Sequence, residues 1–233
     1  MEIIFILSEP AREENVGAAA RAMKTMGFST LRLVQPLCDH LGKRSIATAH
    51  GSTDILQQAT IFDSLYEATE DLSLLIGTAA KKRNIREDRY PVNDLPDILL
   101  AKGDTISNAG VVFGGEEAGL SNNELDQCHI LSTIPMAAPY PSLNLGQAVM
   151  VYASALSPLT LDHKQKKQHD PIFDELRVVR EKARQILQDV AIPADHIIYR
   201  RIMERLMMLD KDDMHLFHSF CKFYLKKYHD RVK

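Results

Sequence analysis

The sequence has no tryptophan and only three cysteines, Cys38, Cys128 and Cys221, which lie far apart along the chain. None belongs to a CxxC pair, and no cluster of cysteine and histidine has the spacing of a zinc site. We therefore expect no bound metal. A chain of this length can bury enough surface to fold without disulfides, and unpatterned thiols are typical of the reducing cytosol.

Long apolar runs are also missing. The first run, Ile3–Leu7, is too short for the core of a signal peptide and follows no basic residue. No stretch approaches the roughly 20 apolar residues that a membrane span needs. The sequence thus predicts a cytoplasmic protein without a membrane partner.

An excess of positive charge is absent as well, because the formal net charge is −3 and the isoelectric point is near 6.3. Any contact with nucleic acid must therefore come from local patches of charge. Apolar residues make up 45% and charged residues 25% of the 233. This composition is that of an ordinary globular domain and disfavours disorder or a fibrous repeat.

Short apolar, β-branched runs alternate with helical patterns over residues 1–156, which predicts an α/β domain with a mainly parallel sheet. Because the runs are almost continuously apolar, we expect helices on both faces of the sheet. The expected strands are Ile3–Leu7, Leu31–Val34, Thr60–Phe62, Ser73–Gly77, Gly110–Phe113 and Ile130–Ile134. The expected helices are Val16–Met26, Ser45–Leu56, Ser64–Asp71, Leu95–Ala101, Ser121–Gln127 and Ser142–Leu156.

The composition changes after this domain. Residues 157–170 combine Pro158 with three lysines and two histidines and predict a linker. Residues 171–233 predict a small all-helical extension with helices over 171–190, 194–209 and 212–228, and Asp195, Asp210 and Asp212 lie near expected helix starts. About 60 helical residues make a marginal core, so we expect the extension to dock on another surface.

Four segments gather glycines and polar residues after expected strands, at the edge where parallel sheets bind ligands. They are Glu9–Lys24, with Asn15 as a candidate N-cap; Gly77–Ala80 followed by the cationic stretch Lys81–Arg89; Val111–Glu124, with a Ser121/Glu124 capping box; and Ile134–Gln147, where Ser142 begins a helix. Each segment alone is also compatible with a structural role, as a tightly packed helix, a solvated loop or a capped turn. No Walker A or GxGxxG motif occurs.

Taken together, the segments resemble the SPOUT superfamily of methyltransferases, in its SpoU/TrmH branch and closest to the TrmJ-like group. The resemblance is carried by three motifs in family order: Asn15-Val-Gly-Ala-Ala-Ala-Arg21, Phe113-Gly-Gly-Glu-Glu-Ala-Gly-Leu120 and Pro141-Ser-Leu-Asn-Leu-Gly-Gln-Ala148. It covers residues 1–156 closely, and the linker and helical extension loosely. It implies a sheet with a deep C-terminal trefoil knot, which is an exception to the rule that chains do not knot.

The resemblance also implies a cofactor, S-adenosylmethionine (SAM), and a homodimer that assembles its site across two subunits. The run Ala18–Ala20 is a candidate for close packing between those subunits. The implied cofactor-binding residues are Thr78, Ala79, Gly114, Ile134, Ser142, Leu143 and Asn144, and the implied catalytic residues are Arg21, Asn15, Glu116, Ser142 and Asn144.

The implied reaction is in-line transfer of the sulfonium methyl group to a ribose 2′-oxygen, which needs no metal. Such a reaction depends on alignment and on removal of a proton from a weak acid. The resemblance implies that Arg21 acts as the base after a substrate phosphate activates it. Because arginine stays protonated, we expect the alternative role, in which Arg21 clamps that phosphate and stabilises the developing alkoxide. Gly115 departs from the group's pattern, in which a cation often follows the glycine, and this puts the RNA substrate in doubt.

The sequence favours an RNA 2′-O-methyltransferase that acts on tRNA. Methylation of rRNA and an inactive RNA-binding knot protein remain alternatives, whereas the missing glycine fingerprint disfavours a Rossmann oxidoreductase. We also expect the extension and the stretch Lys81–Arg89 to help hold the RNA. The alternative is that their cations only lie on ordinary solvated surfaces. The cations in and before the extension are Lys164, Lys166, Lys167, Arg200, Arg201, Arg205, Lys222, Lys226 and Lys227.

Overall fold

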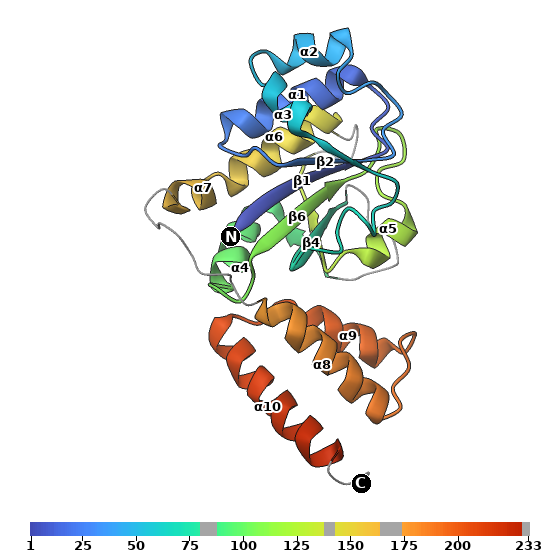
Figure 1. Cartoon of the computed structure of the whole chain (residues 1–233), viewed down its shortest axis with the longest axis vertical. Coiled ribbons are helices and arrows are strands. Elements are labelled where there is room, and N and C mark those ends of the chain that lie inside the picture. Colours follow the sequence, from blue (N-terminus) through green and yellow to red (C-terminus); the bar gives the residue numbers. More distant parts are fainter. Residues whose placement is uncertain (80–87, 138–142, 164–173, 230–233) are drawn as a thin grey trace. The chain divides into compact units, whose positions relative to one another are not determined.

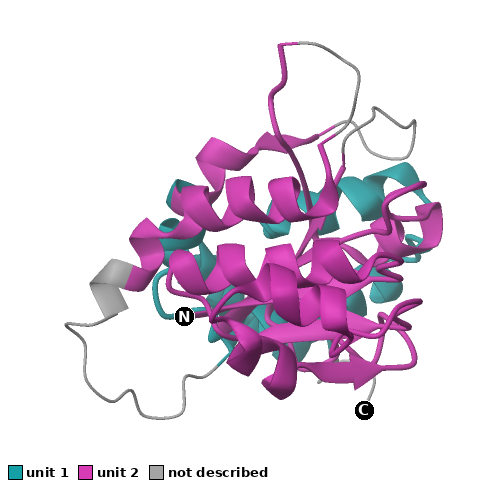
Figure 2. Cartoon of the chain, turned by 90° about the horizontal axis from the view of Figure 1, so that it is seen from above, with its two compact units in different colours: residues 1, 97–107, 169–233 teal, residues 2–96, 108–168 magenta. Residues whose placement is uncertain are grey.

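The computed structural model describes residues 1–79, 88–137, 143–163 and 174–229 (Figure 1). The chain divides into two compact units, one of residues 2–96 and 108–168, and the other of residues 97–107 together with residues 169–233 and Met1 (Figure 2). No helix in the described ranges is both long and apolar enough to cross a membrane. The three cysteines are free thiols.

The first unit is built on a seven-stranded sheet in the order β3-β2-β1-β6-β4-β7-β5, and every recorded strand pair is parallel. This confirms the predicted α/β class with a parallel sheet. The strands are β1 (Glu2–Ser8), β2 (Leu31–Val34), β3 (Thr60–Phe62), β4 (Leu74–Thr78), β5 (Tyr90–Pro91), β6 (Asn108–Phe113) and β7 (Ile130–Thr133). Six of the seven were predicted to within two residues at either end.

The central strands are buried on both faces, as their continuous apolar runs predict. In β1, all residues from Ile3 to Ser8 are buried, and Phe5 stacks on Phe113 of β6 with ring centroids 6.0 Å apart. The helices of this unit are α1 (Glu13–Thr25), α2 (Lys43–Ala49), α3 (Thr53–Gln58), α4 (Leu95–Ala101), α5 (Asn122–Gln127), α6 (Leu145–Leu156) and α7 (Pro158–His163), with a short 3-10 turn at Val92–Asp94. Only the first two residues of α4 belong to this unit.

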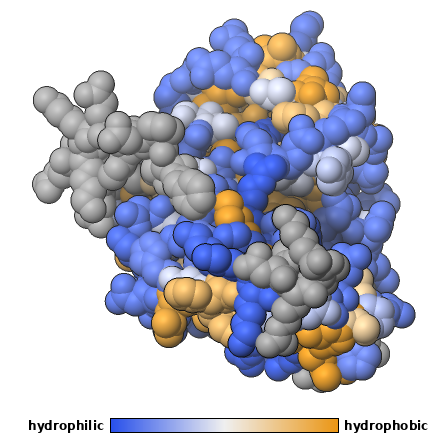
Figure 3. All heavy atoms as spheres, turned by 60° about the horizontal axis from the view of Figure 1, so that its bottom comes forward, coloured by the Kyte–Doolittle hydropathy of each residue, from blue (hydrophilic) through white to orange (hydrophobic). Residues whose placement is uncertain are grey.

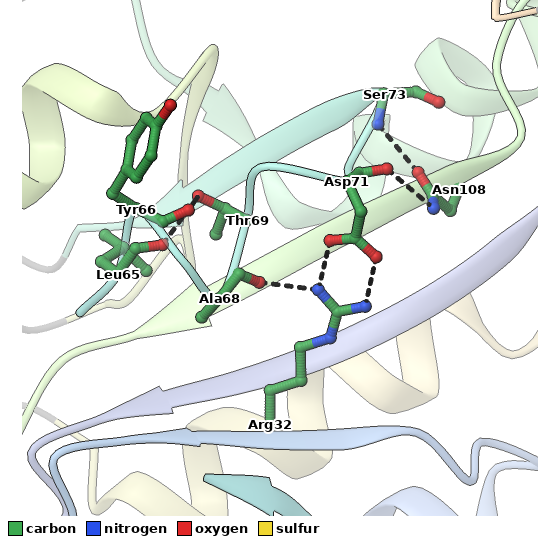
Figure 4. A network of polar contacts seen from close by, with 8 residues as sticks. All are labelled: Arg32, Leu65, Tyr66, Ala68, Thr69, Asp71, Ser73 and Asn108. Atoms are coloured by element: carbon green, nitrogen blue, oxygen red, sulfur yellow. Dashed lines mark hydrogen bonds and ion pairs between the residues drawn. The ribbon is translucent and has the colours of Figure 1, made fainter. Parts of the chain in front are cut away.

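Two helix predictions are wrong. The helix expected over Ser45–Leu56 is split into α2 and α3, because His50 and Gly51 adopt left-handed conformations with φ of 44° and 83°. The segment expected as the helix Ser64–Asp71 forms a series of turns. Its carbonyls are taken by other donors: Arg32 of β2 donates to Ala68 and forms a two-pronged ion pair with Asp71 (Figure 4). Such competing hydrogen bonds replace the helical ladder.

Small residues let the helices of the first unit approach closely. A side chain at Gly17 of α1 would lie 2.1 Å from the Ser45 carbonyl of α2, and one at Gly146 of α6 would lie 2.8 Å from the Ala18 Cβ. Ala19 and Ala20 are fully buried against this packing. The expectation that the alanine run packs against a second subunit is therefore wrong for these two residues, which pack within the chain.

The second unit contains α8 (Glu175–Asp189), α9 (Ile197–Leu206) and α10 (Lys211–His229). Asp174 and Asp210 accept backbone N–H groups at the starts of α8 and α10, and His196 does so for α9 in place of the predicted Asp195. Residues 158–163, predicted as linker, form α7, and Thr160 of α7 packs against Gly27 at the end of α1. The domain boundaries 1–156, 157–170 and 171–233 stay predictions.

The segment 97–107 completes the second unit. The Lys102 side chain is buried, and its ammonium donates to the carbonyls of Met207 and Leu209 at the end of α9. Burial lowers the pKa of Lys102 to about 8, because the charged form loses its hydration. Two further contacts join this segment to the helices of its unit: the Leu176 backbone N–H donates to the Thr105 carbonyl, and Lys211 pairs with Asp104 at 2.8 Å.

Hydrophobic residues also reach the surface in separate patches between hydrophilic ones (Figure 3). Within the second unit the exposed apolar residues include Ile197, Leu216, Phe220 and Phe223, and the Phe217, Phe220, Tyr224 and Tyr228 rings follow one another along α10 with centroids 5.5–6.4 Å apart. This ladder of rings lies on the same helix as Lys222, Lys226 and Lys227.

Candidate active site

The carboxyl ends of β6, β4 and β7, three neighbouring strands, meet at one edge of the sheet. A pocket of about 170 Å³ opens there. It is lined by Thr78 and Ala79 at the end of β4, by residues 113–120 at the end of β6 and in the loop that follows, by Leu125, and by Leu143, Leu145 and Ala148 around the start of α6. Segments far apart in the sequence thus converge at the edge where the sequence analysis placed them. We call this the glycine-loop pocket.

The loop after β6 closes on itself. Gly119 donates to the Gly115 carbonyl at 2.9 Å and adopts φ of 66°, which favours glycine. A side chain on Gly114 would lie 2.1 Å from the backbone of both Gly119 and Leu120, so the loop has no room for one. The predicted capping box at Ser121 and Glu124 is confirmed and fixes the far end of the loop.

A chain of side-chain hydrogen bonds joins the three motifs. Asn15 donates to the Glu116 carboxylate at 2.8 Å and accepts from Asn144 at 2.8 Å. The expectation that Asn15 caps α1 is wrong: the N-cap is Arg12, and Asn15 lies inside the helix and is buried. The Asn15 side chain therefore bonds to distant partners, one in the loop after β6 and one at the N-cap of α6, and not to the nearby backbone as the sequence predicted.

Glu116 serves as a fixed acceptor. Its partial burial alone would raise the pKa of the carboxyl, but hydrogen bonds from the Ala11 backbone N–H, the Asn15 side chain and the Arg12 backbone N–H outweigh it and lower the pKa. The carboxylate therefore stays ionised at neutral pH and holds the loop after β1 against the loop after β6. A lowered pKa makes it a poor acceptor for a substrate proton.

Asn144 sets the start of α6. Its side chain accepts the Gly146 backbone N–H at 2.9 Å, and the Gln147 side chain accepts the Asn144 backbone N–H at 3.1 Å, which completes a capping box. The helix therefore begins at Leu145 rather than at Ser142 as predicted. Ser142 lies outside the described residues.

Arg21 lies on the other side of the start of α6. It lines an open hollow of about 720 Å³ together with Asn144, Gln147 and His50, over a floor of small and apolar residues: Ala18, Ala22, Ala47, Gly146, Met150 and Val151. Its side chain is exposed, and the described residues offer it no ion-pair partner. Lys24, three residues further along α1, pairs with Asp54 at 2.7 Å.

The predicted cofactor residues Thr78, Ala79, Gly114 and Leu143 line the glycine-loop pocket, whereas Ile134 and Asn144 are not among its lining. The sequence analysis missed Leu125, Leu145 and Ala148 as lining residues, because their apolar positions in helices do not differ from ordinary core positions. Gly115 also lines the pocket, and a side chain on it would lie 3.0 Å from the Glu9 carbonyl. The described residues contain no cluster of three or more metal-ligating side chains.

Comparison with models of known protein families identifies the family of this chain. Residues 2–154 match the model of the SpoU rRNA Methylase family. The chain belongs to the SpoU methylase family. A second model, the C-terminal domain of the tRNA/rRNA methyltransferase LasT, matches residues 174–228, which are α8 to α10 of this SpoU methylase.

Relatives match three quarters of the SpoU chain or more. It is 40% identical to the uncharacterized tRNA/rRNA methyltransferase LasT of Escherichia coli K12, over 94% of this chain and 95% of the relative. It is 37% identical to the tRNA (cytidine/uridine-2′-O-)-methyltransferase TrmJ of Pectobacterium atrosepticum, over 75% of this chain and 74% of the relative.

Solved structures of methylase proteins also superpose on almost the whole chain. A probable methylase family protein from Haemophilus influenzae Rd KW20 superposes with a TM-score of 0.66 at 30% identity and covers 99% of this chain and 98% of its own. TrmJ from Z. mobilis ZM4 superposes with a TM-score of 0.65 at 25% identity, over 96% and 99% of the two chains.

Proposed function

We propose that the chain is a cytoplasmic, SAM-dependent methyltransferase that methylates a ribose 2′-hydroxyl in tRNA. The observation that carries this is the bonded chain Glu116–Asn15–Asn144, which joins all three motifs between the glycine-loop pocket and the Arg21 hollow. Support also comes from the TrmJ relatives, which are named for the same chemistry on tRNA.

The glycine-loop pocket fits SAM in its chemistry. Leu125, Leu143 and Leu145 give it apolar walls that suit an adenine ring, and the Glu116 and Glu117 carboxylates lie where a cationic group gains from negative charge. The bound cofactor would supply an electrophilic methyl group. Thr78, Ala79 and the Gly114 loop would hold it, with Ser142, Ile134 and Asn144 as further proposed contacts.

Arg21 would act on the RNA, which accepts the methyl group. As a permanent cation in the hollow, it would clamp a phosphate of the RNA and stabilise the oxygen as negative charge develops on it. Asn144 contacts both sides, since it lines the hollow and is bonded through Asn15 to Glu116. We propose that Asn15, Glu116 and Asn144 fix the position of the glycine-loop pocket relative to the Arg21 hollow. Ser142 would orient the ribose hydroxyl.

The experiment that tests the function is a map of ribose methylations in total RNA from cells with and without the gene. We expect one or more tRNA positions to lose methylation, and purified protein with SAM to restore them. Loss at an rRNA position alone would replace tRNA by rRNA as substrate. No change in any RNA, together with no binding of S-adenosylhomocysteine, would refute the function.

We infer that the chain also carries the family's deep knot. β4 and β5 follow each other in the sequence, but β7 lies between them in the sheet. A sheet in which a later strand lies between two consecutive ones is the arrangement from which such a knot forms.

We further propose a homodimer. The Arg21 hollow has an apolar floor that a monomer leaves partly open to water, and the methyl groups of Ala18 and Ala47 with the side chains of Met150 and Val151 would be covered by a second subunit. We expect light scattering at micromolar concentration to give twice the chain mass. A mass of one chain under those conditions would contradict the dimer.

We propose that α10 helps to hold the RNA through the exposed Lys222, Lys226 and Lys227. Replacing all three by glutamine should weaken tRNA binding and reduce the slope of log affinity against log salt by about 0.7–0.9 for each phosphate that these lysines neutralise. Binding measured between 50 and 300 mM salt, at roughly even steps of ionic strength, checks this.

The matched control is Lys211→Gln on the same helix, since that ammonium is already paired with Asp104 at 2.8 Å. Its salt slope should equal that of the wild type. An unchanged slope in the triple variant would leave α10 with a structural role only. Of the other proposed RNA contacts, Arg200, Arg201 and Arg205 lie on α9, whereas residues 80–87 and Lys164, Lys166 and Lys167 lie outside the described residues.

A further inference from the structure

Helix α10 has two apolar faces, and the described residues cover only one of them. Toward α8, against which α10 packs (Figure 1), it buries Met214, His218 and Cys221. On the opposite side it exposes three large apolar side chains, by 72%, 55% and 77%: Leu216, Phe220 and Phe223. Apolar residues on a second face of a helix indicate that this face is also buried against something.

The three exposed residues form one continuous row, which we call the outer stripe. Phe220 is four residues after Leu216 and three before Phe223, so neighbouring members lie on the same side of the helix, one turn apart. Scattered exposed apolar residues are normal on a protein surface, whereas a contiguous apolar row indicates a binding surface.

Charged residues extend the outer stripe at both ends. Aspartates lie four and three residues before it, and lysines lie three and four residues after it. These charged residues are Asp212, Asp213, Lys226 and Lys227. All four side chains are exposed, and no ion pair joins any of them to another described residue. The row is therefore negative at one end, apolar in the middle and positive at the other end.

The charges are also arranged symmetrically on the two edges of the stripe. One edge carries, at intervals of seven residues, Asp212, Ser219 and Lys226. The other edge carries, at the same intervals, Asp213, Phe220 and Lys227. Seven residues make almost two turns, so each set stays on one side of the helix. On each edge the aspartate and the lysine are equally far from the central residue.

A second copy of α10 that runs in the opposite direction complements this order. Along both edges the aspartates of each helix would face the lysines of the other, and Leu216 would contact Phe223 between them. At the two-fold axis, Ser219 and Phe220 would each face the same residue of the second copy. Contacts about a two-fold axis require such self-complementarity. Parallel helices would instead place like charges against each other, which is unfavourable.

We propose that the outer stripe binds the outer stripe of a second copy of this chain, with the two α10 helices antiparallel. This contact uses residues of the second unit alone, whereas the Arg21 hollow is formed by residues of the first. It does not depend on the proposed chemistry. It applies to the protein free of RNA, because the phosphates of a bound tRNA would compete with the aspartates for Lys226 and Lys227.

Disulfide cross-linking of the full-length protein, purified free of RNA, tests the contact. We expect Ser219→Cys, at the two-fold axis, to give a disulfide-linked dimer at micromolar concentration under mild oxidation, above the background of the wild-type thiols. Asp213→Cys alone should not link, because antiparallel helices place the two copies of this position about 20 Å apart. Asp213→Cys mixed with Lys227→Cys should link.

Charge variants made in the Ser219→Cys background test the ion pairs. Asp212→Lys with Asp213→Lys makes both ends of the stripe positive, and Lys226→Asp with Lys227→Asp makes both ends negative. Exposed ion pairs are weak singly, but about four are reversed together, so either variant alone should give roughly ten-fold less linked dimer. An equimolar mixture should restore linking, in dimers that contain one chain of each. An unfolded α10 could not produce this rescue.

Three results would overturn the proposal: no linked dimer from Ser219→Cys, self-linking of Asp213→Cys, or no gain when the charge variants are mixed. If Ser219→Cys does not link but Phe223→Ala weakens tRNA binding, the outer stripe binds RNA instead of a second copy. The cross-linking readouts do not involve methyl transfer. A failure of this contact therefore leaves the proposed function standing, and an inactive protein leaves the contact standing.

Discussion

Arg21→Ala should lower the rate of methyl transfer about 10²–10³-fold, the usual cost of losing one donor that stabilises developing charge. The affinity for SAM should stay within a few-fold, because Arg21 lines the hollow and not the glycine-loop pocket. Folding should be unaffected, since alanine favours the helix and the side chain is exposed. Single-turnover kinetics with tRNA and calorimetry with S-adenosylhomocysteine measure the two effects separately.

Two further variants sharpen this result. Arg21→Lys keeps the charge but lacks the planar fork, so it should recover only part of the rate if the arginine grips a phosphate with two bonds. Arg44→Ala is the control, because Arg44 is an exposed arginine on α2 that pairs with Glu14 at 3.2 Å and does not line the hollow. Turnover like the wild type in Arg21→Ala would mean that the arginine has been assigned the wrong role.

Gly114→Ala should abolish or strongly weaken cofactor binding. The added methyl group would lie 2.1 Å from the backbone of Gly119 and Leu120, so the loop that forms one wall of the pocket has to open. Overpacking of this kind costs about 1–3 kcal/mol, which corresponds to roughly 5–150-fold weaker binding. Calorimetry with SAM checks the loss, and circular dichroism shows whether the remaining fold is intact.

Gly115→Ala is the graded control for this loop. Its methyl group would meet the Glu9 carbonyl at 3.0 Å, a contact that a small shift relieves. It should therefore bind SAM better than Gly114→Ala does. Equal affinity of Gly114→Ala and the wild type would show that the loop is not the wall of the cofactor site.

Much of the sheet could be predicted because its signals are local. β2, β3 and α4 have the predicted limits, since each is an apolar run bounded by turn residues or proline. The break between α2 and α3 could not be predicted in this way. It depends on the left-handed His50, whose turn is held by Lys24 and Asp54 from other helices.

The candidate site shows the same division between local and tertiary causes. The capping box at Ser121 and Glu124 needs only residues three apart and was predicted from the sequence. Asn15 has a residue type that suits an N-cap, but its partners are more than 100 residues away, and this is why the local interpretation was wrong. β5 has only two residues and lies at the edge of the sheet beside β7, so no sequence pattern could indicate it.

The packing of residues 97–107 has a consequence for the chain during translation. Lys102 lies 105 residues before Met207, whose carbonyl it binds. At about 5–20 residues per second, the ribosome needs roughly 5–20 s to supply that partner. Over this interval Leu99 and Ile106, both fully buried in the folded protein, lack the helices of their unit, while β6, which follows at once, can already join the sheet. The nascent chain therefore exposes an apolar segment that is covered only after α8, α9 and α10 have been synthesised.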